Sequence, residues 1–280
     1  MTTPQPDRLN LWSVHREDMT FRNLSANTIR DRQRVLGALC HGALDLADVQ
    51  TVDIRAFLSR PTPSGRPLSP SSRATYLAHV SSFYRWAVRY KHLDADPTVD
   101  LDPPKVPNRL PRPIPRQALD AAIRTASAEV RAWLMLGALA GLRCSESASL
   151  HADNLRLDDS PPMLRVTGKG GKTRTIPIHP DLAAELAQWP TDGYLFPWRD
   201  SHVKPEEVSR LVNKHLRGLG FKDTAHSTRH RFGTDMYRGT RDIIATKDLL
   251  GHASVATTQV YAQADPSGLY AAISALSFND

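Results

Sequence analysis

The chain has 280 residues, which is enough for two domains of ordinary size. Hydrophobic residues make up 40% of the chain and charged residues 23%, a balance that excludes disorder as a description of the whole. Lys and Arg residues outnumber Asp and Glu residues to give a formal net charge of +7, which favours a polyanionic partner such as nucleic acid.

Neither export nor membrane insertion is predicted. The N-terminus is polar and contains Pro4 and Pro6, and no stretch of apolar residues approaches the length of about 18 that a membrane span needs. The cysteines Cys40 and Cys144 match no metal-binding spacing and fit a reduced compartment. We therefore expect a cytoplasmic protein that does not interact with a membrane.

The first third of the chain is predicted to be all-helical. Apolar side chains recur at helical spacing in four segments, which begin near Leu9, after Ser25, after Thr51 and at Ser69-Pro70. Ser25 and Thr51 are expected to be N-caps of their helices. Residues 61–67 carry three prolines and a glycine and are expected to form a loop. The aromatic residues of the last helix are interpreted as core.

Basic side chains lie among those aromatic residues and continue into a proline-rich segment, residues 94–116. Proline blocks helix formation and keeps such a connector extended. Cations on a rigid helix or on an extended connector suit contacts with a phosphate backbone, although a solvated surface is the alternative interpretation. The predicted DNA-contacting residues in this part of the chain are Arg73, Arg85, Arg89, Lys105, Arg109 and Arg112.

The rest of the chain is predicted to combine helices with a short hairpin. Residues 163–167 and 173–178 have the pattern of two strands, and the glycine-rich residues 168–172 between them are expected to turn. Helices are expected after Pro115, from Glu129 to Gly141, over 180–189 and 205–219, from an N-cap at Ser227 to Gly239, over 243–250, around Tyr261, and after Pro266.

Histidine, arginine and tyrosine recur between His226 and Tyr261 at spacings that a packed core does not require. A phenol has a pKa of about 10 and becomes a useful nucleophile when cations stabilise charge on the group that it attacks. Arginine suits a phosphate, because its planar fork binds two oxygens at once. His226 and His230 are spaced like zinc ligands on a helix, but Arg229 would put a cation beside the metal, so zinc is disfavoured.

Taken in order, Arg143, Lys169, His226-x-x-Arg229, His252 and Tyr261 resemble the active site of the tyrosine recombinases, the phage integrase family that includes the Xer proteins. The resemblance covers nearly the whole chain and implies a mainly α fold with a small β-sheet, in two domains. It places a helical, SAM-like core-binding domain at residues 1–102, a basic proline-rich linker at 103–115 and a mixed α/β catalytic domain at 116–280. The arm-binding domain of lambda-like integrases is expected to be absent.

The resemblance also implies a reaction and a set of roles. Tyr261 would attack a scissile phosphate to form a 3′-phosphotyrosine link, while Arg143 and Arg229 hold the non-bridging oxygens. His226 and His252 would donate hydrogen bonds, with His226 a candidate to take the tyrosine proton, and Lys169 would protonate the 5′-oxygen. The supporting residues would be Glu146 beside Arg143, with Lys172 and Arg174 as phosphate contacts.

The implied activity is site-specific DNA recombination, including DNA integration, without a cofactor or a metal. The implied partners are double-stranded DNA sites and further copies of the chain, in a tetramer that joins two duplexes through a Holliday junction. A type IB topoisomerase, a non-catalytic DNA-binding protein and a metal-dependent hydrolase are the alternatives, in decreasing order. The DNA target, the biological role as phage integrase, chromosomal resolvase or transposon recombinase, and the docking of the C-terminal tail in cis or in trans all stay open.

Overall fold

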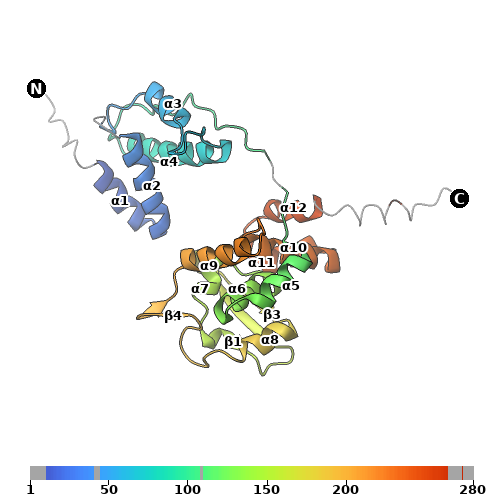
Figure 1. The fold of residues 1–280 in the computed structure, drawn as a ribbon. Coiled ribbons are helices and arrows are strands. Elements are labelled where there is room, and N and C mark those ends of the chain that lie inside the picture. The colour runs from blue at the N-terminus through green and yellow to red at the C-terminus, as the bar shows by residue number, and fades with distance from the viewer. Residues whose placement is uncertain (1–10, 41–44, 108–109, 264–272, 274–280) are drawn as a thin grey trace, which may run out of the picture. The chain divides into compact units, whose positions relative to one another are not determined.

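The computed structural model describes residues 11–40, 45–107, 110–263 and 273, apart from the side chain of Lys169. The chain forms two compact units, Met1–Asn108 and Arg109–Asp280 (Figure 1). Helices dominate both units, and the described strands all belong to the second unit. The predicted fold class, mainly α with a small β-sheet, is confirmed.

The N-terminal unit consists of helices α1 (Leu11–Phe21), α2 (Ala26–Leu39), α3 (Thr51–Ser59) and α4 (Pro70–Arg89). Ser25 caps α2, because its hydroxyl oxygen accepts a hydrogen bond of 3.2 Å from the backbone N–H of Thr28. Ser69 caps α4 in the same way through the N–H of Ser72, at 3.1 Å. The predicted cap at Ser25 and the predicted start of a helix at Ser69-Pro70 are both confirmed.

The prediction that Thr51 caps α3 is wrong. The helix begins at Thr51 itself, and Gln50 is the N-cap, with its backbone N–H donating to the Asp53 carboxylate at 2.8 Å. The Thr51 hydroxyl instead donates to the carbonyl of Pro97, also at 2.8 Å. Thr51 therefore fastens the chain that leaves the helical unit to the start of α3.

The aromatic residues of α4 form the core of the N-terminal unit, as predicted. Phe83, Tyr84 and Trp86 are all at most 5% exposed. His15 of α1 packs edge-on against Phe83 and lies 4.4 Å from the Trp86 ring, centroid to centroid. The hydroxyl of Tyr84 donates to the carbonyl of Leu46 at 2.9 Å, so its polar end is satisfied within the core. These buried rings are structural and are not exposed for stacking with nucleic-acid bases.

The second unit has helices α5 (Arg116–Thr125), α6 (Ala128–Leu139), α7 (Cys144–Ala148), α8 (Pro180–Leu186), α9 (Pro205–Gly218), α10 (Ala225–Thr240), α11 (Ile243–Leu250) and α12 (Ala256–Gln263). Its strands are β1 (Leu155–Arg156), β2 (Met163–Thr167), β3 (Thr173–Pro177), β4 (Pro197–Trp198) and β5 (Ser201–His202), with short 3-10 helices η2 (Ala152–Asn154) and η3 (Lys169–Gly171). Strands β1, β2 and β3 form one antiparallel sheet in that order, and β4 and β5 form a second.

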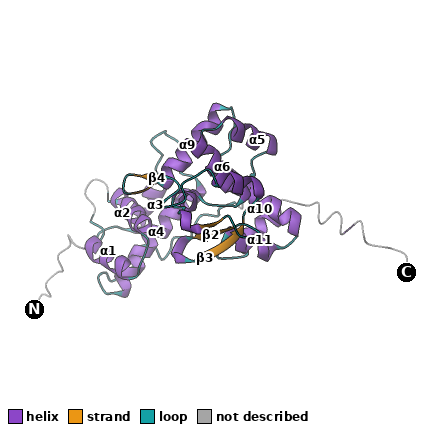
Figure 2. Cartoon of the chain, turned by 90° about the horizontal axis from the view of Figure 1, so that it is seen from below, coloured by secondary structure: helices purple, strands orange, loops and turns teal. Residues whose placement is uncertain are grey.

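The predicted hairpin is present as β2 and β3, with Val166 opposite Arg174 and Thr167 opposite Thr173. Buried and exposed side chains alternate along β2, which is why this segment forms a strand with one face toward the core. Strand β3 lies beside α11 (Figure 2). The sheet therefore carries the η3 turn and Arg174 to the region where α11 ends.

Helix α6 crosses the core of this unit and packs against α10. The two helices approach closely at Gly137, where a Cβ atom would lie 2.0 Å from the Thr228 hydroxyl oxygen. Thr228 is 1% exposed, and its hydroxyl donates to the carbonyl of Ala225 at 2.8 Å. The threonine is thus accommodated by a glycine on the facing helix.

The predicted N-cap of α10, Ser227, is also wrong. The helix begins at Ala225 with Thr224 as its N-cap, and the Ser227 hydroxyl accepts a hydrogen bond of 3.2 Å from the Thr224 backbone N–H. His226 consequently belongs to the first turn of α10. The predicted end of α11 is confirmed, because Gly251 adopts the left-handed conformation with φ of +63°.

The C-terminal tail predicted after Pro266 falls on residues 264–272 and 274–280, outside the described part of the chain. Within the described residues, no helix combines the length and the apolar character that crossing a membrane requires.

Candidate active site

One buried carboxylate organises the cationic side chains of the second unit. Glu146, at the start of α7, is 5% exposed and accepts hydrogen bonds from the backbone N–H and from Nη1 of Arg143, both 2.8 Å long. Nη1 and Nη2 of Arg174 donate to its two oxygens at 2.9 Å each. The guanidinium of Arg229 lies 3.8 Å from it. Three cations around one carboxylate leave two positive charges uncompensated.

These contacts keep Glu146 ionised. Burial alone would raise the pKa of its carboxyl, but the hydrogen bonds from Arg174 and from the Arg143 backbone, with the charges of both guanidiniums, lower it below its usual value. The acid thus serves as a fixed counter-ion that sets the orientation of Arg143 and Arg174.

Arg229 is the most enclosed of the cations. It lies in α10, is 2% exposed, and donates to the carbonyls of Gly141 and Leu250, the latter at 2.6 Å. Burial, and repulsion from Arg143, lower its pKa to about 10, so it remains protonated at neutral pH. The two carbonyls stand just before Arg143 and just before Gly251, which ties α10 to both neighbouring segments.

Tyr261, from α12, lies against α10 and is 2% exposed. Its ring occupies a space beside Gly233, where a Cβ atom would come within 2.5 Å of the tyrosine ring. Burial raises the pKa of the phenol, whereas the charges of Arg229 and Arg143 act in the opposite direction. The net effect is a raised phenol pKa, although both guanidiniums favour the ionised form.

Two histidines contact Tyr261, and a third packs against one of them. Nδ1 of His230 makes a hydrogen bond of 3.2 Å with the Tyr261 hydroxyl, and the His226 ring packs edge-on against His230 with centroids 4.4 Å apart. The His252 ring is stacked on Tyr261, 6.5 Å from its centroid at an angle of 10°, and its Nδ1 pairs with the Thr258 hydroxyl at 2.9 Å.

All three imidazoles are neutral at neutral pH. Burial is the largest cause of the lowered pKa of His226, His230 and His252, and nearby cationic side chains add to it. The pKa falls to about 4 for His230 and for His252. A neutral imidazole has one nitrogen that accepts and one that donates, so each ring is able to bind a proton or to give a hydrogen bond.

A cavity of about 540 Å³ opens beside this cluster. Its walls include Arg143, Lys172, Arg174, Lys247 and His252, and Gly168 just before the η3 turn. Cations dominate the lining, and the acid among them, Asp248, forms an ion pair of 2.5 Å with Lys247. The cationic lining of the cavity suits an anionic group such as a phosphate.

The structure brings together five of the six residues that the sequence pointed to: Arg143, His226, Arg229, His252 and Tyr261. The sixth, Lys169, begins the η3 turn next to the cavity-lining Gly168, and its side chain lies outside the described part of the structure. Glu146 touches Arg143, as expected.

Arg174 makes contacts different from those expected. It was expected to touch a phosphate, yet its side chain is 11% exposed and its three nitrogens donate to Glu146 and to the carbonyl of Leu249. Lys172, two residues earlier, is exposed at the rim of the cavity. A phosphate contact by Lys172 stays a prediction.

His230 and Thr258 were not assigned a role from the sequence. Only their positions in the sequence could have pointed to them: His230 follows Arg229 directly, and Thr258 precedes Tyr261 by three residues. Only the packing of α12 against α10 and α11 shows that they contact the phenol and His252, respectively.

In the N-terminal unit, the expected DNA-contacting residues Arg85 and Arg89 are exposed on α4. With Arg22 they line a second cationic cavity, together with Ser82, Trp86 and Tyr90. Arg73 is partly buried, and its Nε has no hydrogen-bond partner among the described residues.

Of the expected linker contacts, Lys105 and Arg112 are exposed, while Arg109 lies outside the described residues.

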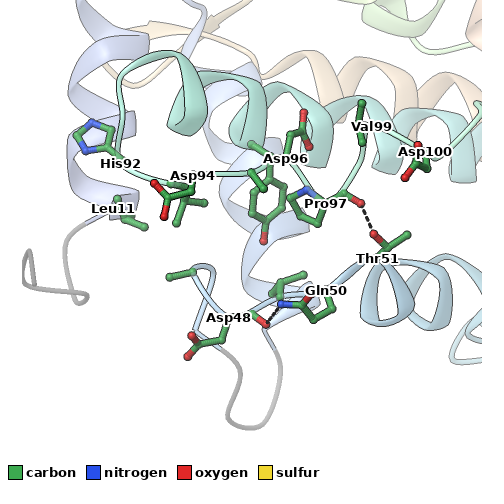
Figure 3. Close-up of a pocket in the computed structure, with 15 residues that line it drawn as sticks. Leu11, Asp48, Gln50, Thr51, His92, Asp94, Asp96, Pro97, Val99 and Asp100 are labelled. Carbon is green, nitrogen blue, oxygen red and sulfur yellow. Dashed lines mark hydrogen bonds between the residues drawn. The ribbon is translucent and has the colours of Figure 1, made fainter.

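Another cavity of this unit has the opposite character. Asp48, Asp94, Asp96 and Asp100 contribute to its walls (Figure 3). These carboxylates would repel a phosphate backbone. Of these two cavities, the one on the basic side of α4 is the one whose charge suits DNA.

Within the described residues, no group of three or more His, Cys, Asp or Glu side chains is arranged to hold a metal ion.

Comparisons with known proteins agree with this architecture. Residues 115–267 match the model of the phage integrase family, and residues 19–91 match its N-terminal SAM-like domain. The tyrosine recombinase XerC of Methylobacterium nodulans is 33% identical over 290 residues, covering 91% of this chain and 88% of that protein. XerC of Xanthomonas campestris is 30% identical over 268 residues, covering 87% and 80% of the two chains.

Solved structures with the same fold include a lambda integrase dimer bound to a core site, with a TM-score of 0.70 and 18% identity over 93% of this chain and 81% of that one. The integrase of the Tn1549 transposon, in complex with transposon end DNA, has a TM-score of 0.72 and 16% identity over 95% and 98%. At this identity the structures show the fold alone. With the family model and the XerC relatives, they place the chain in the phage integrase family, the tyrosine recombinases.

Proposed function

We propose that the chain is a site-specific DNA recombinase that cuts and rejoins DNA through a 3′-phosphotyrosine intermediate, with Tyr261 as the nucleophile. The observation that supports this most directly is the burial of the Tyr261 phenol against α10, in contact with His230 and His252, where the charges of Arg229 and Arg143 oppose the rise that burial causes in the phenol pKa. A structural tyrosine has no need of two such cations.

The charge of the site fits the chemistry. Attack of a phenol oxygen on a phosphodiester builds up negative charge on the non-bridging oxygens, and fixed cations stabilise that charge without reorganising. The two positive charges that Glu146 leaves uncompensated suit a transition state with more negative charge than the starting phosphodiester. Arg143 and Arg229 would hold the oxygens, with His252 as a further hydrogen-bond donor.

Lys169 would protonate the departing 5′-oxygen. Support comes from the backbone, since the η3 turn begins at Lys169 and the preceding Gly168 lines the cationic cavity. Gly170 and Gly171 both adopt positive φ in this turn, a conformation that favours glycine. Lys172 at the cavity rim would contact a neighbouring phosphate.

The phosphotyrosine link conserves the energy of the phosphodiester bond, so that a 5′-hydroxyl of a partner strand can attack it and restore continuous DNA. Exchange of strands between two duplexes would pass through a Holliday junction, which requires a tetramer of the chain. Double-stranded DNA would contact the basic side of α4, the linker cations Lys105, Arg109 and Arg112, and the catalytic unit. The protein would act in the cytoplasm, without a cofactor or a metal.

Covalent capture tests the proposal. The protein is incubated with fragmented genomic DNA and denatured, and the ends of the protein-bound fragments are sequenced. We expect adducts at one or a few sequences, and none with Tyr261→Phe, which should still bind DNA. Adducts in the Tyr261→Phe variant would remove Tyr261 from its role.

Adducts at scattered sequences would favour the type IB topoisomerase alternative. Strand exchange between two copies of a captured site then separates the two enzymes, because a topoisomerase relaxes supercoils without joining strands from different duplexes.

A further inference from the structure

The phenol of Tyr261 is hydrogen-bonded to a histidine outside the set of residues that the sequence identified. Nδ1 of His230 lies 3.2 Å from the Tyr261 hydroxyl oxygen. His226, the residue expected to take the tyrosine proton, contacts the ring of His230, at 4.4 Å between centroids. The histidine at hydrogen-bonding distance from the attacking atom is therefore His230.

His230 is held firmly in this position. It follows Arg229 in α10, whose guanidinium is anchored on the carbonyls of Gly141 and Leu250. One turn earlier the His226 ring packs edge-on against His230, and Gly233 leaves the space in which the Tyr261 ring lies. Residues 226, 230 and 233 share one face of α10, so the helix itself sets the distance between imidazole and phenol.

We propose that His230 orients Tyr261 and accepts its phenol proton through Nδ1 when the phenol oxygen attacks the phosphate. The proposal rests on the proposed function, in which Tyr261 is the nucleophile, and it assigns the proton transfer to His230 instead of His226.

The step balances with the groups already named. The Oη–H bond of Tyr261 breaks and its proton passes to Nδ1 of His230, while Oη forms a bond to phosphorus and the bond from phosphorus to the 5′-oxygen breaks. The 5′-oxygen takes its proton from the Lys169 ammonium, as proposed above. In the rejoining step the imidazolium of His230 returns its proton to Oη as the phosphotyrosine bond breaks.

The charges around His230 suit a base that works only with DNA in place. The pKa of His230 is lowered to about 4 by burial first, then by His226 and Arg229 on the same helix. The ring is thus neutral at neutral pH, with a lone pair available on one nitrogen. An entering phosphodiester brings a negative charge to the site, which favours the imidazolium and raises the pKa of His230.

Two substitutions separate the two parts of the role. His230→Ala removes both the hydrogen bond and the base. His230→Asn places an amide oxygen near the position of Nδ1, which accepts a hydrogen bond from the phenol but does not take up a proton at neutral pH. The exposed His179, at the start of α8, offers a matched control in His179→Ala.

The measurement is the single-turnover rate of adduct formation on a duplex that contains a captured site. We expect His230→Ala and His230→Asn each to slow this rate by about 10²–10⁴-fold, the usual contribution of a general base. His179→Ala should leave the rate unchanged. The wild-type rate should rise with pH to a plateau, whereas the rate of both His230 variants should keep rising toward the phenol pKa.

If His230→Asn has the rate and pH profile of the wild-type protein, His230 only orients the phenol, and the proposed proton transfer is overturned. A His230→Ala rate within about threefold of wild type, or above it, would overturn the whole proposal. A rate above that of the wild-type protein would mean that the hydrogen bond restrains the phenol instead of activating it. Nitrogen NMR of the labelled wild-type protein is an independent check, because a proton on Nδ1 of the resting His230 would contradict acceptance by that atom.

The failures of the two proposals are distinguishable. Absence of adducts with the wild-type protein, or their persistence in Tyr261→Phe, overturns the proposed function and this inference with it. Adducts that need Tyr261 but form equally fast without His230 overturn this inference alone.

Discussion

The guanidinium of Arg174 and the carboxylate of Glu146 form two parallel hydrogen bonds, each 2.9 Å long. The same guanidinium donates through Nε to the carbonyl of Leu249 at 2.8 Å. A residue on β3 thus joins the acid that orients Arg143 to the last turn of α11, just before His252. Such bidentate pairs fix orientation as well as distance.

Glu146→Gln should destabilise the catalytic unit. The substitution keeps the shape of the side chain but leaves three guanidiniums without their shared counter-ion. We expect a loss of about 3 kcal/mol, as for removal of one partner of a buried ion pair, measured by urea denaturation. Glu207→Gln is the control, because Glu207 pairs with Arg210 on the exposed side of α9 and its loss should not shift the unfolding midpoint.

Arg174→Ala and Lys172→Ala should have different effects on DNA. Arg174 supports Glu146 from inside the unit, so its loss should reduce the rate of adduct formation much more than the affinity for DNA. Lys172 is exposed beside the cavity, so its loss should weaken binding and lower the slope of log affinity against log salt by about 1. Equal effects of the two substitutions on binding and rate would show that Arg174 contacts DNA directly.

Gly233→Ala should displace the phenol, because the added Cβ would lie 2.5 Å from the Tyr261 ring. We expect adduct formation to slow by at least about tenfold, the effect of a barrier raised by about 1.4 kcal/mol. Gly239→Ala, in the same helix, meets no atom within 4 Å and serves as the control. It should leave the rate unchanged and stabilise the protein by up to about 1 kcal/mol through helix propensity. A normal rate in Gly233→Ala would show that the packing of Tyr261 on α10 is unimportant for catalysis.

Acidification should destabilise the N-terminal unit through His15. This ring is fully buried, and burial, with the charge of Arg32, lowers its pKa from 6.5 to about 4. Between these pH values the unfolded chain binds a proton that the folded unit excludes, so stability is complete above pH 6.5 and falls as the pH decreases toward 4. At about 1.4 kcal/mol per pKa unit, the loss is at most about 4 kcal/mol.

The variant His15→Gln checks the assignment. It keeps an acceptor near Arg32, whose Nη1 donates to Nε2 of His15 at 3.2 Å, and it removes the titrating group. Urea denaturation at both ends of the pH range should show a smaller acid-induced loss in this variant than in the wild-type protein. An identical loss would assign the pH dependence to other groups.

Much of this architecture is predictable from local sequence signals. Ser69 followed by Pro70 starts α4 where predicted, and Gly251 ends α11, because each signal acts on the backbone within one turn. The hairpin of β2 and β3 is predictable because its strands alternate around a glycine-rich turn. The pattern of catalytic residue types was likewise visible without any contact between them.

The predictions from the sequence are wrong where a contact with a distant part of the chain decides the role of a side chain. Thr51 has the composition of an N-cap, but its hydroxyl is used by the carbonyl of Pro97, 46 residues away. Arg174 is predicted to contact a phosphate, but its guanidinium is paired with Glu146, 28 residues away. Strands β4 and β5 have two residues each, which is too short for alternation to be seen.

The packing of the Tyr261 ring beside Gly233 has a consequence for an assembly in which several copies of the chain act on DNA. Because the chain buries its tyrosine against its own α10, we expect each copy to cut with its own nucleophile and not with that of a neighbour. In an assembly that mixes wild-type chains with Tyr261→Phe chains, the number of strands cut should therefore equal the number of wild-type chains bound. If neighbours exchanged nucleophiles instead, a mixture of Arg229→Ala chains and Tyr261→Phe chains would cut DNA, although neither variant cuts alone.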